Sequence, residues 1–220
     1  MSEFSDNSRK PAIPLTSVSF FGAVTASVSH ELNNVVSIID QSAGLLDDLA
    51  AGAMQGNAID PARLVRVAEA IGRQTERGID IIRRLNRFAH STDVPVCTYD
   101  LNEVVGNLGS LIKRLADMRQ VEVSVEPYFE ELEITGDPFL LQHVLFAAYA
   151  LLLQQVVADD SIAFIVQSDQ EKPVVMLEYQ TAREDFVPDF SGLNELGNTD
   201  PLVIDVRPEP RRSEIYVRIA

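Results

Sequence analysis

Cysteine is almost absent from the sequence, which contains a single one, Cys97, among 220 residues. One cysteine excludes an internal disulfide and any metal cluster that several cysteines would hold. Cys97 lies in a proline-containing linker with no evident histidine partner, so we interpret it as incidental. At 220 residues the chain is long enough for one large domain or two small ones, each with a buried core.

Positive charge is also scarce. The sequence contains 18 lysines and arginines against 33 aspartates and glutamates, which gives a formal net charge of −15. Proteins that bind nucleic acids need basic side chains to displace the counterions of the phosphates. The charge balance therefore argues against a nucleic-acid partner.

Long hydrophobic runs are missing as well. No uninterrupted apolar stretch reaches the roughly 18 residues that a membrane-spanning helix needs. The N-terminus lacks the charged start and the apolar centre of a signal peptide. We therefore expect no membrane partner and a cytoplasmic location.

The first part of the chain contains helical periodicity. Residues 1–14 are polar and interrupted by prolines, which predicts a disordered lead-in. A helical pattern extends over about residues 17–51 and a second over about residues 61–89, with Asp60 as the N-cap of the second helix. The two helices predict an antiparallel hairpin over residues 15–91. One apolar face of such a hairpin would stay uncovered, so we expect a homodimer whose four helices form one bundle.

The second predicted helix carries apolar residues at spacings of three and four, which is typical of a bundle seam. These residues are Leu64, Val67 or Ala68, Ile71, Gly78, Ile82, Leu85 and Ala89.

The pattern changes after a linker that ends near residue 98. Helices and strands alternate over residues 98–220, which predicts a second domain. Helices are expected from Asp100 to about Met118 and from Asp137 to about Val157, because each aspartate is a suitable N-cap. Strands are expected in "QVEVSVEP", "SIAFIVQS", "PVVMLEYQ", "PLVIDVRP" and "EIYVRIA". The predicted fold class is α+β, a long helical hairpin followed by an α/β sandwich of mixed strand order.

His30 lies in the stretch "SHELNN" within the first predicted helix. The bulky apolar residues of this helix cluster on one side of a helical wheel, and His30 lies opposite them. The residues along the helix surface on the same side as His30 form a stripe. They are small or uncharged and polar, among them Asn34 and Gln41, so another protein can approach the imidazole closely. Glu31 lies about 100° round the helix, where it would orient the imidazole and support its positive charge. The alternative is an exposed histidine on a solvated helix face.

The stretch "SVSHELNNVVSII" resembles the phosphoacceptor box of bacterial two-component histidine kinases. Further segments support this resemblance by their order. "ERGIDIIRRLNRFAH" is similar to the second helix of the dimerisation and histidine phosphotransfer domain, "YDLNEVVGNLGSLIKRLADMRQVEVSVE" to the entry of the kinase ATPase domain, and "GDPFLLQHVLFAAYALL" to its nucleotide-box helix. The resemblance covers about residues 18–157.

The sequence departs from this family at the nucleotide site. Active kinases carry asparagines that bind the metal and phosphates of ATP where this chain has Ala147 and Leu151, which offer no oxygen ligand. The Asp-x-Gly-x-Gly turn is replaced by "TAREDFVPDFSG", and the second glycine-rich box and the lid are missing from "GLNELGNTDPLVIDV". We therefore expect a degenerate ATPase-like domain, with no cofactor and no metal ion bound by this chain.

The phosphoacceptor region is intact by comparison. An intact phosphoacceptor region joined to a degenerate ATPase-like domain resembles the bacterial histidine phosphotransferases built on a kinase-like dimer. It implies that His30 carries a phosphoryl group between the aspartates of response-regulator receiver domains. Glu31 would accept the proton, Asn34 would position a water for receiver dephosphorylation, and Mg²⁺ would come from the receiver. Two alternatives stay open: an ATP-dependent sensor kinase with a diverged nucleotide site, and a non-catalytic pseudokinase scaffold that binds receivers.

Receiver docking in this family uses the face below the histidine, which offers Ile38, Gln41 and Leu45 here. Packing within the bundle explains Ile38 and Leu45 equally well.

Three arginines form a second candidate surface for the receiver. If the hairpin turns near Gly56, Arg83, Arg84 and Arg87 lie opposite the phosphoacceptor histidine, where they would attract an acidic receiver. Alternatively, these arginines form surface ion pairs with the nearby carboxylates of Glu31, Glu76 and Asp80.

Overall fold

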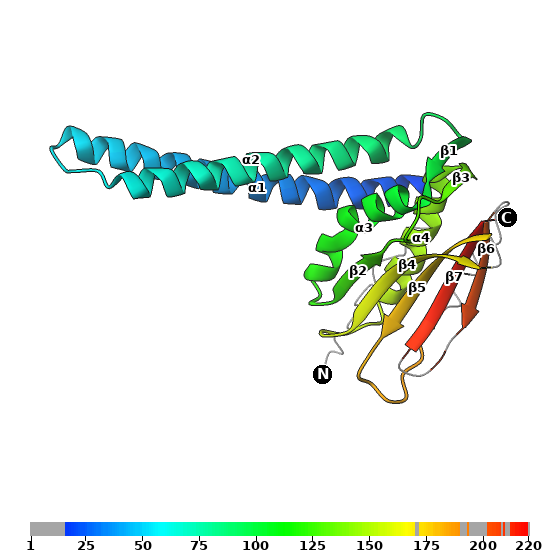
Figure 1. Cartoon of the computed structure of the whole chain (residues 1–220). Coiled ribbons are helices and arrows are strands. Elements are labelled where there is room, and N and C mark those ends of the chain that lie inside the picture. The colour runs from blue at the N-terminus through cyan, green and yellow to red at the C-terminus, as the bar shows by residue number, and fades with distance from the viewer. Residues whose placement is uncertain are drawn as a thin grey trace, which may run out of the picture.

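The computed structural model describes residues 16–169, 172–189, 193, 202–207, 209 and 212–219, so the predicted lead-in lies outside the described residues. Its elements, in chain order, are α1 (Ser17–Met54), α2 (Pro61–His90), β1 (Cys97–Asp100), α3 (Leu101–Asp117), β2 (Glu122–Glu126), β3 (Glu133–Gly136), α4 (Pro138–Leu153), β4 (Ser161–Asp169), β5 (Lys172–Gln180), β6 (Leu202–Arg207) and β7 (Arg212–Ile219). Figure 1 shows the α1–α2 hairpin projecting from the part that contains the sheet, with its turn at the far end. The predicted α+β class is confirmed.

Aspartates begin α2, α3 and α4, as predicted. The side chain of Asp60 accepts a hydrogen bond from the backbone N–H of Ala62 at 2.9 Å, and Asp100 and Asp137 bind the first N–H groups of their helices in the same way. The predicted end of α4 near Val157 is wrong, because the helix ends at Leu153 and turns sharply there. None of the helices in the described part of the chain has the length and apolar character that crossing a membrane requires.

The main sheet has five strands in the order β2-β4-β5-β7-β6. β2 pairs with β4 in parallel and every other neighbouring pair is antiparallel, so the predicted mixed order is confirmed. β2 and β6 form the two edges. β1 and β3 were not predicted; they form a separate antiparallel pair in which Cys97 lies opposite Gly136. Each has only four residues, and its pairing partner is distant in sequence, so neither gives a local strand signal.

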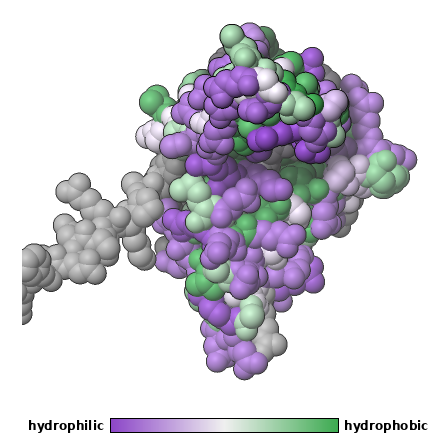
Figure 2. Space-filling model, turned by 90° about the vertical axis from the view of Figure 1, so that its left-hand side faces the viewer, coloured by the Kyte–Doolittle hydropathy of each residue, from purple (hydrophilic) through white to green (hydrophobic). Residues whose placement is uncertain are grey.

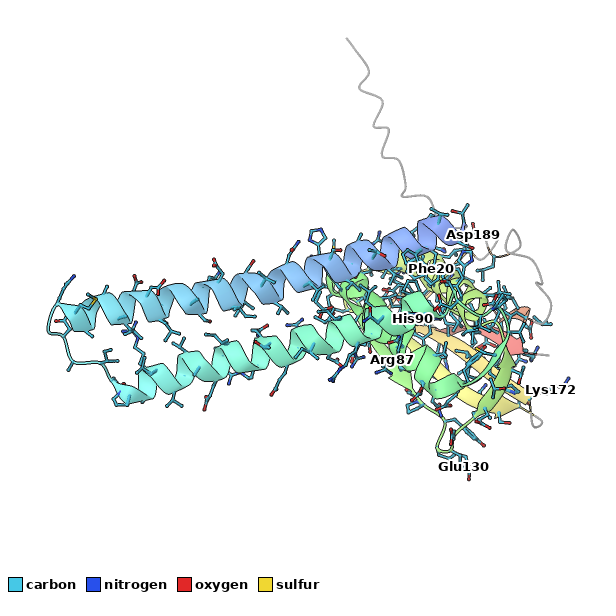
Figure 3. The ribbon with its side chains drawn as sticks, turned by 90° about the horizontal axis from the view of Figure 1, so that it is seen from above. Phe20, Arg87, His90, Glu130, Lys172 and Asp189 are labelled. Atoms are coloured by element: carbon cyan, nitrogen blue, oxygen red, sulfur yellow. The ribbon has the colours of Figure 1, made fainter. Side chains whose placement is uncertain are left out.

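One hydrophobic core extends from the base of the hairpin to the space between the helices and the sheet. Phe20 of α1 and Phe88 of α2 are fully buried, and their rings meet edge to face at a centroid distance of 5.3 Å. Phe20 also contacts the rings of Phe139, His143 and Phe146 of α4 at 5.4, 5.3 and 4.9 Å. Figure 3 places Phe20 at the base of the hairpin, against the sheet part. The predicted hairpin and sandwich therefore share a core, and the division into two domains stays a prediction.

Within the hairpin, α1 and α2 approach each other closely at Gly78. A Cβ atom at this position would lie 3.3 Å from Cγ1 of Val35, so the absence of a side chain permits the contact. Of the residues predicted for the seam of α2, Val67 and Gly78 are buried within one copy of the chain, and so is Ile81, which was not predicted. Ile82 is 47% exposed and Leu64 is 38% exposed in one copy, so their place in a bundle seam stays a prediction.

Gly109 of α3 packs directly on β2, and its substitution provides a test of this contact. A Cβ atom at Gly109 would lie 2.3 Å from Cγ2 of Val125, whereas a Cβ atom at Gly106 on the same helix meets no atom within 4 Å. We expect Gly109→Ala to lower the free energy of unfolding by about 1–3 kcal/mol through overpacking. Gly106→Ala should raise it by up to about 1 kcal/mol, because alanine favours helix. Urea denaturation measures both, and equal losses would contradict the close contact.

Candidate functional site

The side chain of His30 is exposed on α1, as the helical wheel predicts. Asn34 and Gln41, which share its stripe, are exposed as well. On the other side of the helix, Val28 and Val35 are 1% and 3% exposed and pack into the core. The helix thus turns its apolar side chains inward and leaves the imidazole open to a partner.

Glu31 makes a contact that the sequence analysis did not predict. Its Oε1 accepts a hydrogen bond from Nη2 of Arg77 at 2.8 Å, which links α1 to α2. The Glu31 side chain is 25% exposed, and its described partner is this arginine rather than the imidazole of His30. The predicted role of Glu31 in orienting His30 therefore requires the carboxylate to leave Arg77, and it stays a prediction.

Arg77 was not among the arginines predicted to lie opposite His30, which were Arg83, Arg84 and Arg87. The hairpin does turn at Gln55 and Gly56, as that prediction assumed, and Arg84 lines a cavity together with Glu31 and Arg77. Arg84 forms an ion pair with Asp80 at 2.7 Å, which is one of the alternatives predicted for the arginine cluster. Arg83 and Arg87 are exposed.

α3 crosses the hairpin next to the part of α1 that contains His30. The buried hydroxyl of Ser27 donates a hydrogen bond to the carbonyl oxygen of Leu111 at 3.2 Å, across 84 residues of sequence. Beyond this contact, Asn34 of α1 and Lys113 and Arg114 of α3 line a cavity of about 410 Å³. Sequence analysis missed both cations, because no local pattern indicates which side of α3 faces the hairpin.

The predicted receiver-docking face lies further along α1, toward the turn. Ile38 is 37% exposed, Gln41 is exposed and Leu45 is half-buried. An exposed isoleucine next to a polar side chain suits an interface, and the docking role of these residues stays a prediction.

The positions predicted to correspond to the nucleotide box carry hydrophobic side chains in the core. Ala147 is 0% exposed and Leu151 is 4% exposed, and both are surrounded by protein. The segment that replaces the Asp-x-Gly-x-Gly turn is anchored at the end of α4: the guanidinium of Arg183 lies 3.4 Å from the ring centroid of Phe186, and its Nη2 donates to the carbonyl oxygen of Gln155 at 2.9 Å. The predicted loss of the second glycine-rich box falls on residues that, apart from Leu193, lie outside the described part of the chain.

A further cavity of about 540 Å³ lies where α2 ends against β1, α3 and the start of α4. Tyr99, Val104 and Pro138 line this cavity together with polar side chains, among them Asn107 and Gln142. Burial, together with the nearby carboxylate of Asp137 and the thiol of Cys97, raises the pKa of Tyr99, so its hydroxyl stays protonated at neutral pH.

Among the residues that the structure describes, no group of three or more His, Cys, Asp or Glu side chains is arranged to hold a metal ion.

Comparison with known proteins gives matches among solved structures. No known family model matches the sequence, and no curated protein does. Histidine kinase AdeS of Acinetobacter baumannii has a TM-score of 0.48 at 12% identity, over 87% of this chain and 97% of that chain. A histidine kinase from Burkholderia phymatum STM815 has a TM-score of 0.45 at 10% identity, over 84% and 97%. Histidine kinase ThkA, in complex with response regulator protein TrrA, has a TM-score of 0.47 at 15% identity, over 92% and 62%.

Proposed function

We propose that this chain is a dimeric histidine phosphotransferase of a two-component phosphorelay, which carries a phosphoryl group on His30 between receiver-domain aspartates. The observation that supports it is the contrast between an exposed histidine and a buried, apolar pair of residues at the expected nucleotide site. The imidazole of His30 is exposed on a helix, within a motif that resembles a phosphoacceptor box. Ala147 and Leu151 are buried in the core at the positions where kinases bind the metal and phosphates of ATP. The chain thus offers a nucleophile and no oxygen ligands at those two positions.

The proposed reaction requires little more than an accessible nitrogen. The lone pair of one ring nitrogen of His30 forms a bond to phosphorus while the bond from phosphorus to the receiver aspartate breaks, and the electron pair leaves with that carboxylate. Catalysis of this kind depends on in-line positioning and on stabilisation of the phosphoryl charge. The receiver would supply Mg²⁺ from its acidic pocket, and Glu31, once free of Arg77, would take the imidazole proton.

Asn34 supports a second reaction with a docked receiver, which is hydrolysis of its aspartyl phosphate. It lies one turn after His30, is exposed, and lines the cavity next to α3. An amide at this place can position a water molecule for attack on the receiver's aspartyl phosphate, which would give receiver phosphatase activity.

A second copy of the chain would cover the outer face of the hairpin. Large apolar side chains remain exposed along both helices of one copy: Val36 is 61% exposed, Val65 55%, Ile79 44% and Ile82 47%. Pairing of two hairpins through these residues would give the predicted four-helix bundle. Ile38, Gln41 and Leu45 of α1, with Arg83, Arg84 and Arg87 of α2, are the residues proposed to contact the receiver.

The test is incubation of the purified chain with receivers phosphorylated at aspartate with a labelled phosphoryl group. We expect acid-labile, alkali-stable label on His30 within minutes and its passage to a second receiver. Absence of label with every receiver of the same genome, together with retained binding, would favour the non-catalytic scaffold.

Titration with labelled ATP separates the remaining alternative. Because Ala147 and Leu151 offer no oxygen, we expect no saturable binding up to millimolar nucleotide, with or without Mg²⁺. Saturable binding in the micromolar range, followed by label on His30, would instead identify an ATP-dependent kinase.

A further inference from the structure

α3 forms one wall of a groove that runs along the hairpin, and we call it the α3 groove. Three adjoining cavities of about 530, 410 and 220 Å³ make up this groove, and Ser110 and Lys113 line all three. Asn34, one turn after His30, lines one end of the groove, and Val125 of the edge strand β2 lines the other. The α3 groove therefore begins beside the phosphoacceptor stretch and ends on the sheet part of the molecule.

Cations gather in the α3 groove although the chain as a whole is acidic, with a net charge of −15. The lining cations are Arg77, Arg84, Arg87, Lys113 and Arg114. Arg77 and Arg84 each form an ion pair with a carboxylate of the hairpin. For Arg87, Lys113 and Arg114, the contacts of the described residues include no hydrogen bond and no ion pair.

Two further carboxylates line the groove, Glu103 and Asp117. Neither forms an ion pair within the described part of the chain. Three unpaired cations therefore face two unpaired carboxylates, and the groove keeps a local excess of positive charge. Figure 2, which looks onto the hairpin end of the molecule, shows that hydrophilic side chains prevail on this face.

We infer that the α3 groove receives an acidic surface of the receiver domain while the receiver covers His30, an inference that rests on the proposed function. An acidic partner is repelled by most of an acidic chain, so it is steered toward the place where cations are in excess. Arg87 belongs to the hairpin, whereas Lys113 and Arg114 belong to α3. The receiver therefore contacts both parts of the molecule, and the sheet part, which lacks oxygen ligands at positions 147 and 151, supplies one wall of the docking surface.

Charges at the rim of an interface act mainly on the association rate and on its salt dependence. We expect the double variant Lys113→Glu with Arg114→Glu to slow the receiver-driven labelling of His30 about tenfold at low ionic strength. At 0.5 M salt the variant and the wild type should converge, because exposed charges are then screened within roughly 4 Å.

The matched control reverses two arginines at the far end of the hairpin, Arg63→Glu with Arg66→Glu. Both arginines are exposed at the start of α2, and the change in net charge is the same. A second variant, Lys113→Gln with Arg114→Gln, removes the charges without introducing carboxylates and should show a smaller loss. Direct phosphorylation of His30 by phosphoramidate, a small donor that needs no docking, reports on the histidine itself and should be unchanged in every variant.

Three outcomes would overturn the inference while the proposed function stands. These are equal slowing in the groove variant and the control, unchanged receiver-driven rates in both groove variants, and a loss with phosphoramidate that matches the loss with receivers. If the wild type accepts label from phosphoramidate but from no receiver, the proposed function itself fails and the inference fails with it.

Discussion

Replacing His30 with alanine is expected to abolish phosphoryl transfer from labelled receivers, to below one part in a thousand of the wild-type rate. The side chain is exposed, so its removal disturbs no packing and the fold should be retained. The loss follows because alanine has no lone pair that can attack phosphorus. Quench-flow measurement of labelled protein after mixing with a phosphorylated receiver gives the rate.

Two controls make the result specific. Ser37→Ala changes an exposed side chain on the same stripe of α1 and should transfer at a rate close to that of the wild type. Receiver binding by His30→Ala, measured by calorimetry, should stay within about threefold, since most interface residues cost less than about 1 kcal/mol when truncated to alanine. Label that persists in His30→Ala at the wild-type rate would exclude His30 as the phosphoacceptor.

Replacing Phe20 with alanine is expected to lower the free energy of unfolding by about 3–5 kcal/mol. The ring is fully buried and contacts four other aromatic rings from α2 and α4. Its removal leaves a cavity at the point where the hairpin joins the sheet part, and the lost contacts come from both sides of that junction. Thermal and urea denaturation, followed by far-UV circular dichroism, measure the change.

Phe129→Ala is the matched control for this variant. Phe129 is 78% exposed in the loop between β2 and β3, so its loss should change the free energy of unfolding by no more than about 0.5 kcal/mol. A similar cost for the two variants would mean that the junction does not hold the hairpin to the sheet part.

Local chemistry made much of this fold predictable from sequence. Asp60 and Asp137 each precede a proline and begin a helix, because an aspartate cap and a proline at the first position act within one turn. The outward direction of His30 followed from the period of α1 alone. The end of α4 at Leu153 could not be predicted in this way, since neither glycine nor proline follows the helix and apolar residues continue to Val157.

The candidate site was predictable only in part, because several of its contacts join segments that are far apart in sequence. The motif singled out His30 as a candidate phosphoacceptor, but the partner of Glu31 depends on how α1 packs against α2, which no single residue encodes. Lys113 and Arg114 reach the neighbourhood of Asn34 through the packing of α3 on the hairpin. Contacts of this kind join segments far apart in sequence, and periodicity within one helix carries no information about them.

The charged edge of the sheet has a consequence for how two copies of the chain can meet. Within the described residues β2 pairs on one side only, with β4, and Glu122 and Glu126 at its ends are exposed. Two molecules that approached each other along this edge would bring carboxylates together, which disfavours growth of a continuous sheet from one molecule to the next. Growth along the β2 edge is thereby opposed, whereas pairing through the hairpin, as proposed above, would join two molecules in a closed pair instead of a fibre.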